Sequence, residues 1–165
     1  MKKFVLVSVL LAGLMFSSSL GVCAKTTVDE DRVVSEIGML VNNGKYNAAL
    51  KKADEFILKY PENAYLYYWK GTALSSLGNK KEAVENFSKS IEILPENVGS
   101  YILRGVCKYE LDDYDGALAD YNKAIELDPD NISAYYMRAG LKLHIGDLDG
   151  ANADFEHHGK SEENN

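Results

Sequence analysis

The sequence is poor in cysteine, proline and basic residues, and each shortage excludes a class of protein. Its 165 residues include two cysteines, Cys23 and Cys107, three prolines and one tryptophan. If Cys23 leaves with the N-terminal segment described below, one thiol remains and no internal disulfide can form. Cys107 is then expected to be a small buried apolar residue rather than a reactive thiol.

Acidic residues outnumber basic ones by 25 to 18, so the net charge is -7. Residues 1–24 hold two of the basic residues and none of the acidic ones, so their removal would leave 16 against 25, a net charge of -9. An acidic chain without a basic patch would repel a polyanion such as a nucleic acid rather than bind it. We therefore expect no nucleic-acid partner.

The first 24 residues predict a secretory signal peptide. Two lysines precede an apolar run from Phe4 to Phe16, and small polar residues then lead to Val22, Cys23 and Ala24. As a helix this run would span about 20 Å, whereas the hydrocarbon core of a membrane is about 30 Å thick. We expect cleavage after Ala24, no permanent membrane span, and a secreted or periplasmic protein.

Cys23 raises an alternative, a lipoprotein anchored through this cysteine. Bacterial lipoproteins are cleaved just before a lipidated cysteine that follows a pattern such as Leu-Ala-Gly. Here Leu20, Gly21 and Val22 precede the cysteine, and the valine departs from that pattern. The corresponding alternative function is a lipid-anchored subunit of an envelope or secretion assembly.

A period of 34 residues organises the rest of the chain after a linker at residues 25–29. Rows of this length begin at Glu30, Ala64, Val98 and Ile132 and end together at Asn165. Two columns keep one residue type: Ala49, Ala83, Ala117 and Ala151, and Pro61, Pro95 and Pro129. Two others pair small with large residues: Gly71, Gly105 and Ala139, and Phe87, Tyr121 and Phe155. Small and large residues at fixed spacing predict knob-into-hole packing of two helices in each row.

This pattern resembles the tetratricopeptide repeat (TPR), a two-helix unit of 34 residues. The resemblance covers residues 30–165, as repeats 30–63, 64–97, 98–131 and 132–165. Its matches are Tyr67, Gly71, Gly78, Ala83, Phe87 and Pro95 in the second row, and Tyr101, Gly105, Tyr114, Ala117, Tyr121, Ala124 and Pro129 in the third. The first row is degenerate but keeps Gly44, Tyr46, Ala49 and Pro61 in register.

The resemblance implies an all-α, right-handed α-solenoid of four two-helix units with one concave face. We expect helices near residues 30–43, 46–59, 62–77, 80–94, 96–111, 114–127, 130–145 and 148–158. In two columns that would be buried against a following repeat, the last row has Asn152 and Gly159 where the earlier rows have leucine, valine or isoleucine. We therefore expect the last row to be a terminal cap.

Lys70, Arg104 and Arg138 occupy one charged column. Asp120 and Asp154 follow the two arginines by 16 residues and lie on the second helix of the same unit. We expect an ion pair between the two helices of each of these units, with a structural role.

Patterns typical of enzymes are missing from the sequence: it has no glycine-rich phosphate loop, no metal-spaced Cys/His set and no nucleophile motif. Glu156, His157 and His158 are adjacent, but neighbours on a helix point about 100° apart and do not share an ion comfortably. An enzyme built on a repeat scaffold is a third hypothesis, although the four rows leave little sequence for it. We predict no catalysis, no cofactor and no metal.

The resemblance also implies a binding surface, because the first helix of each TPR unit lines a groove that meets peptides. Carried over by position, the groove is aromatic and nearly uncharged. Its predicted partner-binding residues are Tyr65, Tyr68, Trp69, Thr72, Ile102, Val106, Tyr109, Tyr136, Met137 and Leu143. The alternative is that some of these aromatics pack between repeats.

Chaperone-binding members of the family clamp a C-terminal carboxylate with lysine, asparagine and arginine. The matching positions here hold Val34, Gly38, Trp69, Gly99 and Leu103, or Tyr68, Thr72, Leu103, Ser133 and Met137, and none of these can make that clamp. We predict a non-catalytic adaptor of the cell envelope that binds a protein or peptide of unknown identity. Formation of a homo-oligomer is left open.

Overall fold

The structure, a computed structural model, describes residues 29–162, all of whose regular elements are helices. The first helix lies at residues 29–42. The others are α2 (Tyr46–Lys59), α3 (Ala64–Ser76), α4 (Lys80–Ile93), α5 (Val98–Tyr109), α6 (Tyr114–Leu127), α7 (Ile132–His144) and α8 (Leu148–Glu162). The predicted signal peptide, its cleavage site and Cys23 lie outside the described residues. Within them, every helix is too short or too polar to cross a membrane.

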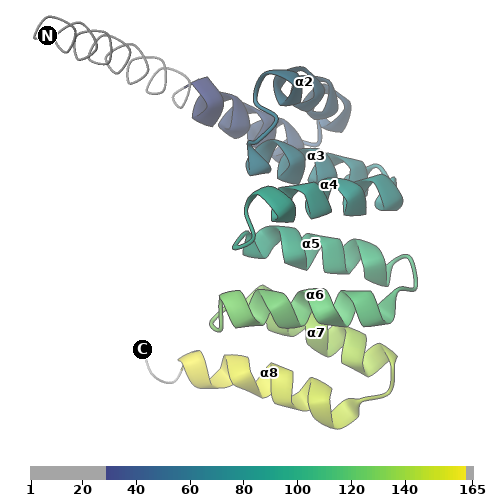
Figure 1. Cartoon of the computed structure of the whole chain (residues 1–165). Coiled ribbons are helices and arrows are strands. Elements are labelled where there is room, and N and C mark those ends of the chain that lie inside the picture. Colours follow the sequence, from purple (N-terminus) through teal and green to yellow (C-terminus); the bar gives the residue numbers. More distant parts are fainter. Residues whose placement is uncertain (1–28, 163–165) are drawn as a thin grey trace, which may run out of the picture.

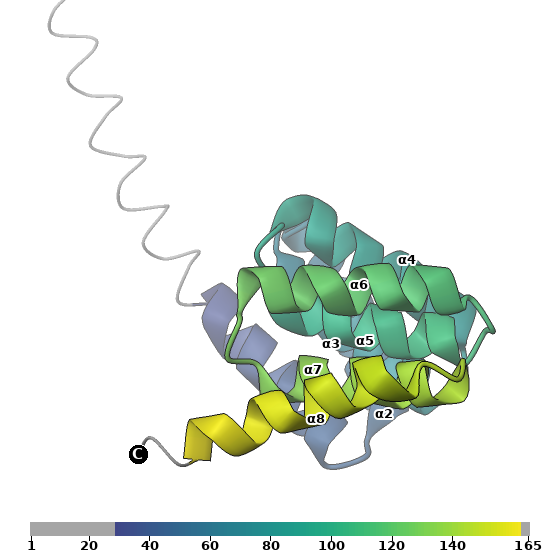
Figure 2. The same ribbon diagram turned by 90° about the horizontal axis from the view of Figure 1, so that it is seen from below.

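The helices stack as a solenoid of antiparallel hairpins, which confirms the predicted all-α fold (Figure 1). From α2 to α8, each helix packs against the next one in the chain, and α5 also packs against both α3 and α7. The first helices of successive units therefore lie side by side. Seen along the stack, successive hairpins are turned relative to one another (Figure 2).

Three helices begin two residues later than we predict. The side-chain oxygens of Asn63, Asn97 and Asn131 accept hydrogen bonds of 3.1–3.2 Å from backbone N–H groups of the turn that follows. Each asparagine is therefore the N-cap, and the helix starts after it rather than before it. At the other end of the chain, α8 runs to Glu162, past the predicted end at residue 158.

The turn inside each unit requires a left-handed residue. Gly44, Gly78 and Gly146 have φ angles of 71°, 86° and 85°, which glycine adopts without steric cost. The third unit has Asp112 at this position, with a φ of 62°, and its carboxylate accepts a hydrogen bond of 2.8 Å from the Tyr114 hydroxyl. Reversal at these residues brings the two helices of a unit into contact.

The predicted knob-into-hole packing is confirmed. A Cβ atom built on Gly71 would lie 2.9 Å from the Phe87 ring, and one built on Gly105 would lie 2.6 Å from the Tyr121 ring. Both rings are buried, whereas Phe155 in the same column of the last unit is 36% exposed. Glycine therefore allows the two helices of the second and third units to approach closely.

The predicted ion pairs are also confirmed. Arg104 binds both carboxylate oxygens of Asp120, at 2.6 and 2.9 Å, and Arg138 binds Asp154 at the same two distances. The two aspartates are 4% exposed, so these charges lie inside the helix pair. A lysine one turn further on, Lys108 in the third unit, lies 2.9 Å from the second oxygen of Asp120.

The same arginines link each unit to the one before it. The remaining guanidinium nitrogen, Nη1, donates to Ser88 from Arg104 at 3.0 Å and to Asn122 from Arg138 at 2.7 Å. Both acceptors lie on the second helix of the preceding unit. One side chain therefore fixes a helix pair and also its contact with the preceding pair.

The first two units use other charges at these positions. Glu36 and Lys52 form the first unit's pair with the signs reversed. In the second unit Asn86 occupies the position of Asp120 and Asp154, and Lys70 pairs instead with Asp54 of the preceding unit, at 2.7 Å. The position is therefore charged in all four units, while its partner varies.

We predict that Arg104→Met lowers the free energy of unfolding by about 3 kcal/mol, because it leaves Asp120 buried with Lys108 as the cation beside it. Urea denaturation followed by circular dichroism measures the change. The double variant Arg104→Met/Asp120→Leu should recover most of the loss, since an apolar pair can replace a buried ion pair. A single variant as stable as the wild type would contradict a structural role.

Two glycine variants should have opposite effects. Gly105→Ala should destabilise the protein by about 2 kcal/mol, because the new methyl group meets the buried Tyr121 ring. Gly140→Ala should stabilise it by about 0.5–1 kcal/mol, because nothing lies within 4 Å of its added Cβ and alanine favours a helix. Thermal unfolding of both variants tests the pair, and equal shifts would contradict the close approach at Gly105.

Candidate functional site

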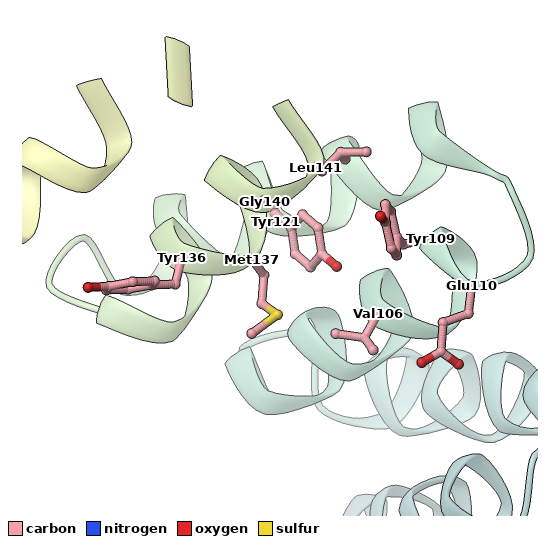
Figure 3. A pocket seen from close by; sticks show the side chains of 8 residues that line it. All are labelled: Val106, Tyr109, Glu110, Tyr121, Tyr136, Met137, Gly140 and Leu141. Atoms are coloured by element: carbon pink, nitrogen blue, oxygen red, sulfur yellow. The ribbon is translucent and has the colours of Figure 1, made fainter. Parts of the chain in front are cut away.

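A cavity of about 360 Å³ opens between α5 and α7 (Figure 3). Helix α6 contributes Tyr121, whose ring lies among the other lining side chains in Figure 3. The complete lining is Val106, Tyr109, Glu110, Tyr121, Tyr136, Met137, Gly140 and Leu141. The cavity thus joins the first helices of the third and fourth units.

The lining is mainly apolar and aromatic. Tyr136 and Met137 are 46% and 41% exposed, so large parts of both side chains face solvent. Glu110 is the one charged residue of the lining, and its carboxylate forms an ion pair with Lys80 from α4. An apolar group entering the cavity would therefore meet no unpaired charge.

Tyr121 differs from the other lining residues because it is both polar and fully enclosed. Its side chain is 2% exposed, and no hydrogen bond joins its hydroxyl to another residue in the range 29–157. Burial, with a smaller contribution from the Asp120 carboxylate, raises the pKa of Tyr121 well above its ordinary value. Tyrosine is already neutral at physiological pH, and the raised pKa only extends that range.

A histidine and two tyrosines form a cluster beside the cavity. The His144 ring lies 5.4 Å from the Tyr109 ring and 5.0 Å from the Tyr114 ring, measured between centroids. His144 Nε2 is 3.1 Å from the Tyr114 hydroxyl oxygen. This cluster holds Tyr109, which forms one wall of the cavity.

Four of the ten sequence-predicted groove residues line this cavity: Val106, Tyr109, Tyr136 and Met137. The others do not. Tyr65 and Leu143 are exposed elsewhere on their helices, at 49% and 46%. Ile102 is half-buried beside Tyr101, and the Thr72 hydroxyl donates to the Tyr68 carbonyl at 2.9 Å.

Tyr68 and Trp69 contact the neighbouring units on both sides. A Cβ built on Gly38 of the first unit would lie 2.8 Å from the Trp69 indole. One built on Gly99 of the third unit would lie 3.2 Å from the Tyr68 ring. The two rings also meet edge to face at 5.0 Å. Much of their surface is therefore occupied by packing between repeats.

The ten predicted residues omit four that line the cavity, Glu110, Tyr121, Gly140 and Leu141. Of these, Tyr121 stood in a column assigned to packing. For Tyr121 the sequence contained a signal. The same column holds phenylalanine at Phe87 and Phe155, so the hydroxyl is the feature that differs between repeats. For Leu141 no comparable signal exists, because leucine is an ordinary core residue.

His157 and Cys107, which were considered for metal or thiol chemistry, have ordinary structural surroundings. From residue 29 to residue 157, no group of three or more His, Cys, Asp and Glu residues could hold a metal ion. The His157 ring stacks on Tyr135, with 4.1 Å between ring centroids. The buried Cys107 thiol lies 3.3 Å from the Ser75 hydroxyl, and burial raises the pKa of this thiol.

Comparison with protein families gives two matches. A model described as "Tetratricopeptide repeat" matches residues 40–98, and one described as "TPR repeat" matches residues 107–141. Together they span parts of all four predicted units. Among curated proteins, none matches the sequence.

Solved structures share the fold at low sequence identity. The chain is similar to MamA, with a TM-score of 0.74, 22% identity, and coverage of 80% of this chain and 77% of MamA. It is also similar to a thermophilic TPR protein of Thermus thermophilus, TTC0263, with a TM-score of 0.69, 20% identity, and coverage of 76% and 70%.

The first TPR of Spaghetti (RPAP3), bound to the HSP90 peptide SRMEEVD, gives a TM-score of 0.66 and 19% identity, over 68% of this chain and 90% of that one. The TM-scores show a shared fold, and at such low sequence identity these three comparisons show the fold alone. The repeat models and the stacked hairpins agree, and the chain belongs to the tetratricopeptide-repeat family.

Proposed function

We propose that this protein is a non-catalytic adaptor that binds a protein or peptide along the face formed by α3, α5 and α7. The observation that carries the proposal is the cavity between α5 and α7, with Tyr136 and Met137 half-exposed at its edge. Half-exposed aromatic and methionine side chains beside a cavity are typical of surfaces that bind partners. The peptide complex of Spaghetti supports the proposal that this fold presents a peptide-binding face.

The partner we propose is not an acidic peptide of the SRMEEVD kind. The one charge lining the cavity is the carboxylate Glu110, and its Lys80 partner already neutralises it. The chain is also acidic overall, at -7. An acidic tail would gain no basic contact at the cavity and would be repelled by the chain as a whole. Apolar side chains fit this surface better.

The size of the apolar surface favours a weak or transient complex. Burying two or three large apolar side chains contributes about 2 kcal/mol each, or roughly 4–6 kcal/mol. Association costs about 4 kcal/mol or more in lost translational and rotational freedom. Tight binding would therefore require backbone hydrogen bonds or several linked sites in addition.

We also propose that the protein works in the cell envelope or outside the cell, after cleavage behind Ala24. The support is the order of charged, apolar and small residues in the first 24 positions. The alternative proposal, a lipid anchor on Cys23, would place the same repeats at a membrane surface as part of an envelope or secretion assembly.

The double variant Tyr136→Ala/Met137→Ala should lose at least tenfold in partner affinity, because both side chains are half-exposed at the cavity edge. Affinity capture from the native envelope fraction, followed by titration of the captured partner, measures the loss. The melting temperature should fall by a few degrees at most, since neither side chain is buried.

The matched control is Met39→Ala/Leu58→Ala, which removes two apolar side chains that are 55% and 87% exposed in the first unit, away from the cavity. It should capture the partner as the wild type does. Equal capture by the cavity variant and the wild type would show that the partner binds elsewhere.

Mass spectrometry of the purified native protein distinguishes the two proposed N-termini. A chain that starts at an unmodified Lys25 is expected for the secreted or periplasmic form. A chain that starts at a diacylated Cys23 would support the anchored form instead. A retained Met1 would contradict both.

A further inference from the structure

The Tyr121 hydroxyl is a buried hydrogen-bonding group in the lining of the cavity, and no residue within 29–157 satisfies it. The side chain is 2% exposed. A buried hydroxyl without a partner costs free energy, and such groups are uncommon in folded proteins. In Figure 3 it is directed between Val106 and Tyr109, toward the space that the lining encloses.

Packing does not explain the hydroxyl. The Tyr121 ring fills the hole above Gly105, as the Phe87 ring fills the hole above Gly71 in the preceding unit. Phe87 is 0% exposed, so phenylalanine performs the packing role completely. The hydroxyl is therefore an addition to what packing requires, in the unit where the cavity lies beside it.

The shape and chemistry of the cavity restrict what could bind the hydroxyl. A volume of about 360 Å³ is near the lower end of ligand pockets, which suits one side chain better than a cofactor. Tyr109 offers an aromatic ring and Met137 offers a sulfur, both of which favour an aromatic ring. The Tyr136 ring instead packs edge to face on Phe155, with 5.4 Å between ring centroids. A charged group would find no free counter-charge in the lining, because Glu110 is paired with Lys80.

We propose that this cavity takes one aromatic side chain of the partner, a tyrosine or a tryptophan, and that the Tyr121 hydroxyl hydrogen-bonds to the polar atom of that side chain. The inference rests on the proposed function, since it names the anchor that the same groove would hold. Tyr121 can either donate or accept, so both a phenol O–H and an indole N–H satisfy it. Tyr121 thereby becomes the residue that determines specificity.

The test compares 4-methylphenol with toluene, which differ by one hydroxyl, on the wild-type protein and on Tyr121→Phe. Titrations followed by ¹⁵N–¹H NMR give both affinities, with the amides of Val106, Tyr109 and Met137 reporting occupation of the cavity. Tyr121→Phe should weaken 4-methylphenol by roughly five- to tenfold, the contribution of one hydrogen bond. It should leave toluene unchanged or bound more tightly.

The variant should fold normally, because Phe87 fills the equivalent position. Its melting temperature should equal or exceed that of the wild type, since an unsatisfied buried hydroxyl is removed. A change of the same size for both ligands, no change for either, or no shift of the three amides would each overturn the inference.

The ligand titrations test the role of Tyr121 separately from the proposed adaptor function. Selective weakening of 4-methylphenol supports the cavity even if Tyr136→Ala/Met137→Ala still captures the partner, which would overturn the adaptor surface alone. Conversely, loss of capture by that double variant together with unselective small-ligand binding would retain the adaptor surface and overturn the role of Tyr121.

Discussion

Two buried carboxylates set the geometry on which the rest of the structure depends. Asp120 and Asp154 are 4% exposed, and each is held by an arginine from the facing helix. A carboxylate that loses this partner remains in a medium that solvates it poorly, so the helix pair cannot slide or separate cheaply. Because Arg104 and Arg138 also bond to the preceding unit, the same constraint passes from one hairpin to the next.

The cavity follows from that constraint. The ion pairs tie α5 and α7 each to its own second helix, and these two helices form opposite walls of the cavity. Gly105 lets the α6 ring of Tyr121 reach through to this space, because any Cβ at that position would displace the ring. A packing feature of the fold therefore brings a polar atom to the cavity.

Much of this was predictable from the sequence, because a repeat protein shows each structural role several times. The 34-residue period predicted the hairpins, the small and large columns predicted the contact of Gly105 with Tyr121, and the charge column predicted Arg104 with Asp120. Details that depend on the contacts of a single side chain could not be predicted in this way. The asparagine caps shifted three helix starts, and Lys70 pairs with Asp54 of the preceding unit, whereas the equivalent position in its own unit holds Asn86.

The site was less predictable than the fold for a physical reason. An aromatic on the first helix can face solvent or cover a neighbouring backbone, and the outcome depends on residues one whole repeat away. Trp69 lies over Gly38 and Tyr68 lies over Gly99. Because each glycine lies in a neighbouring unit and has no side chain, it leaves room for the ring to pack against that unit. What all repeats share reflects packing, and a residue that departs from its column without a packing reason is the better guide to function. Tyr121 fits that description, because its ring packs as the Phe87 ring does, whereas its hydroxyl has no equivalent at Phe87 or Phe155.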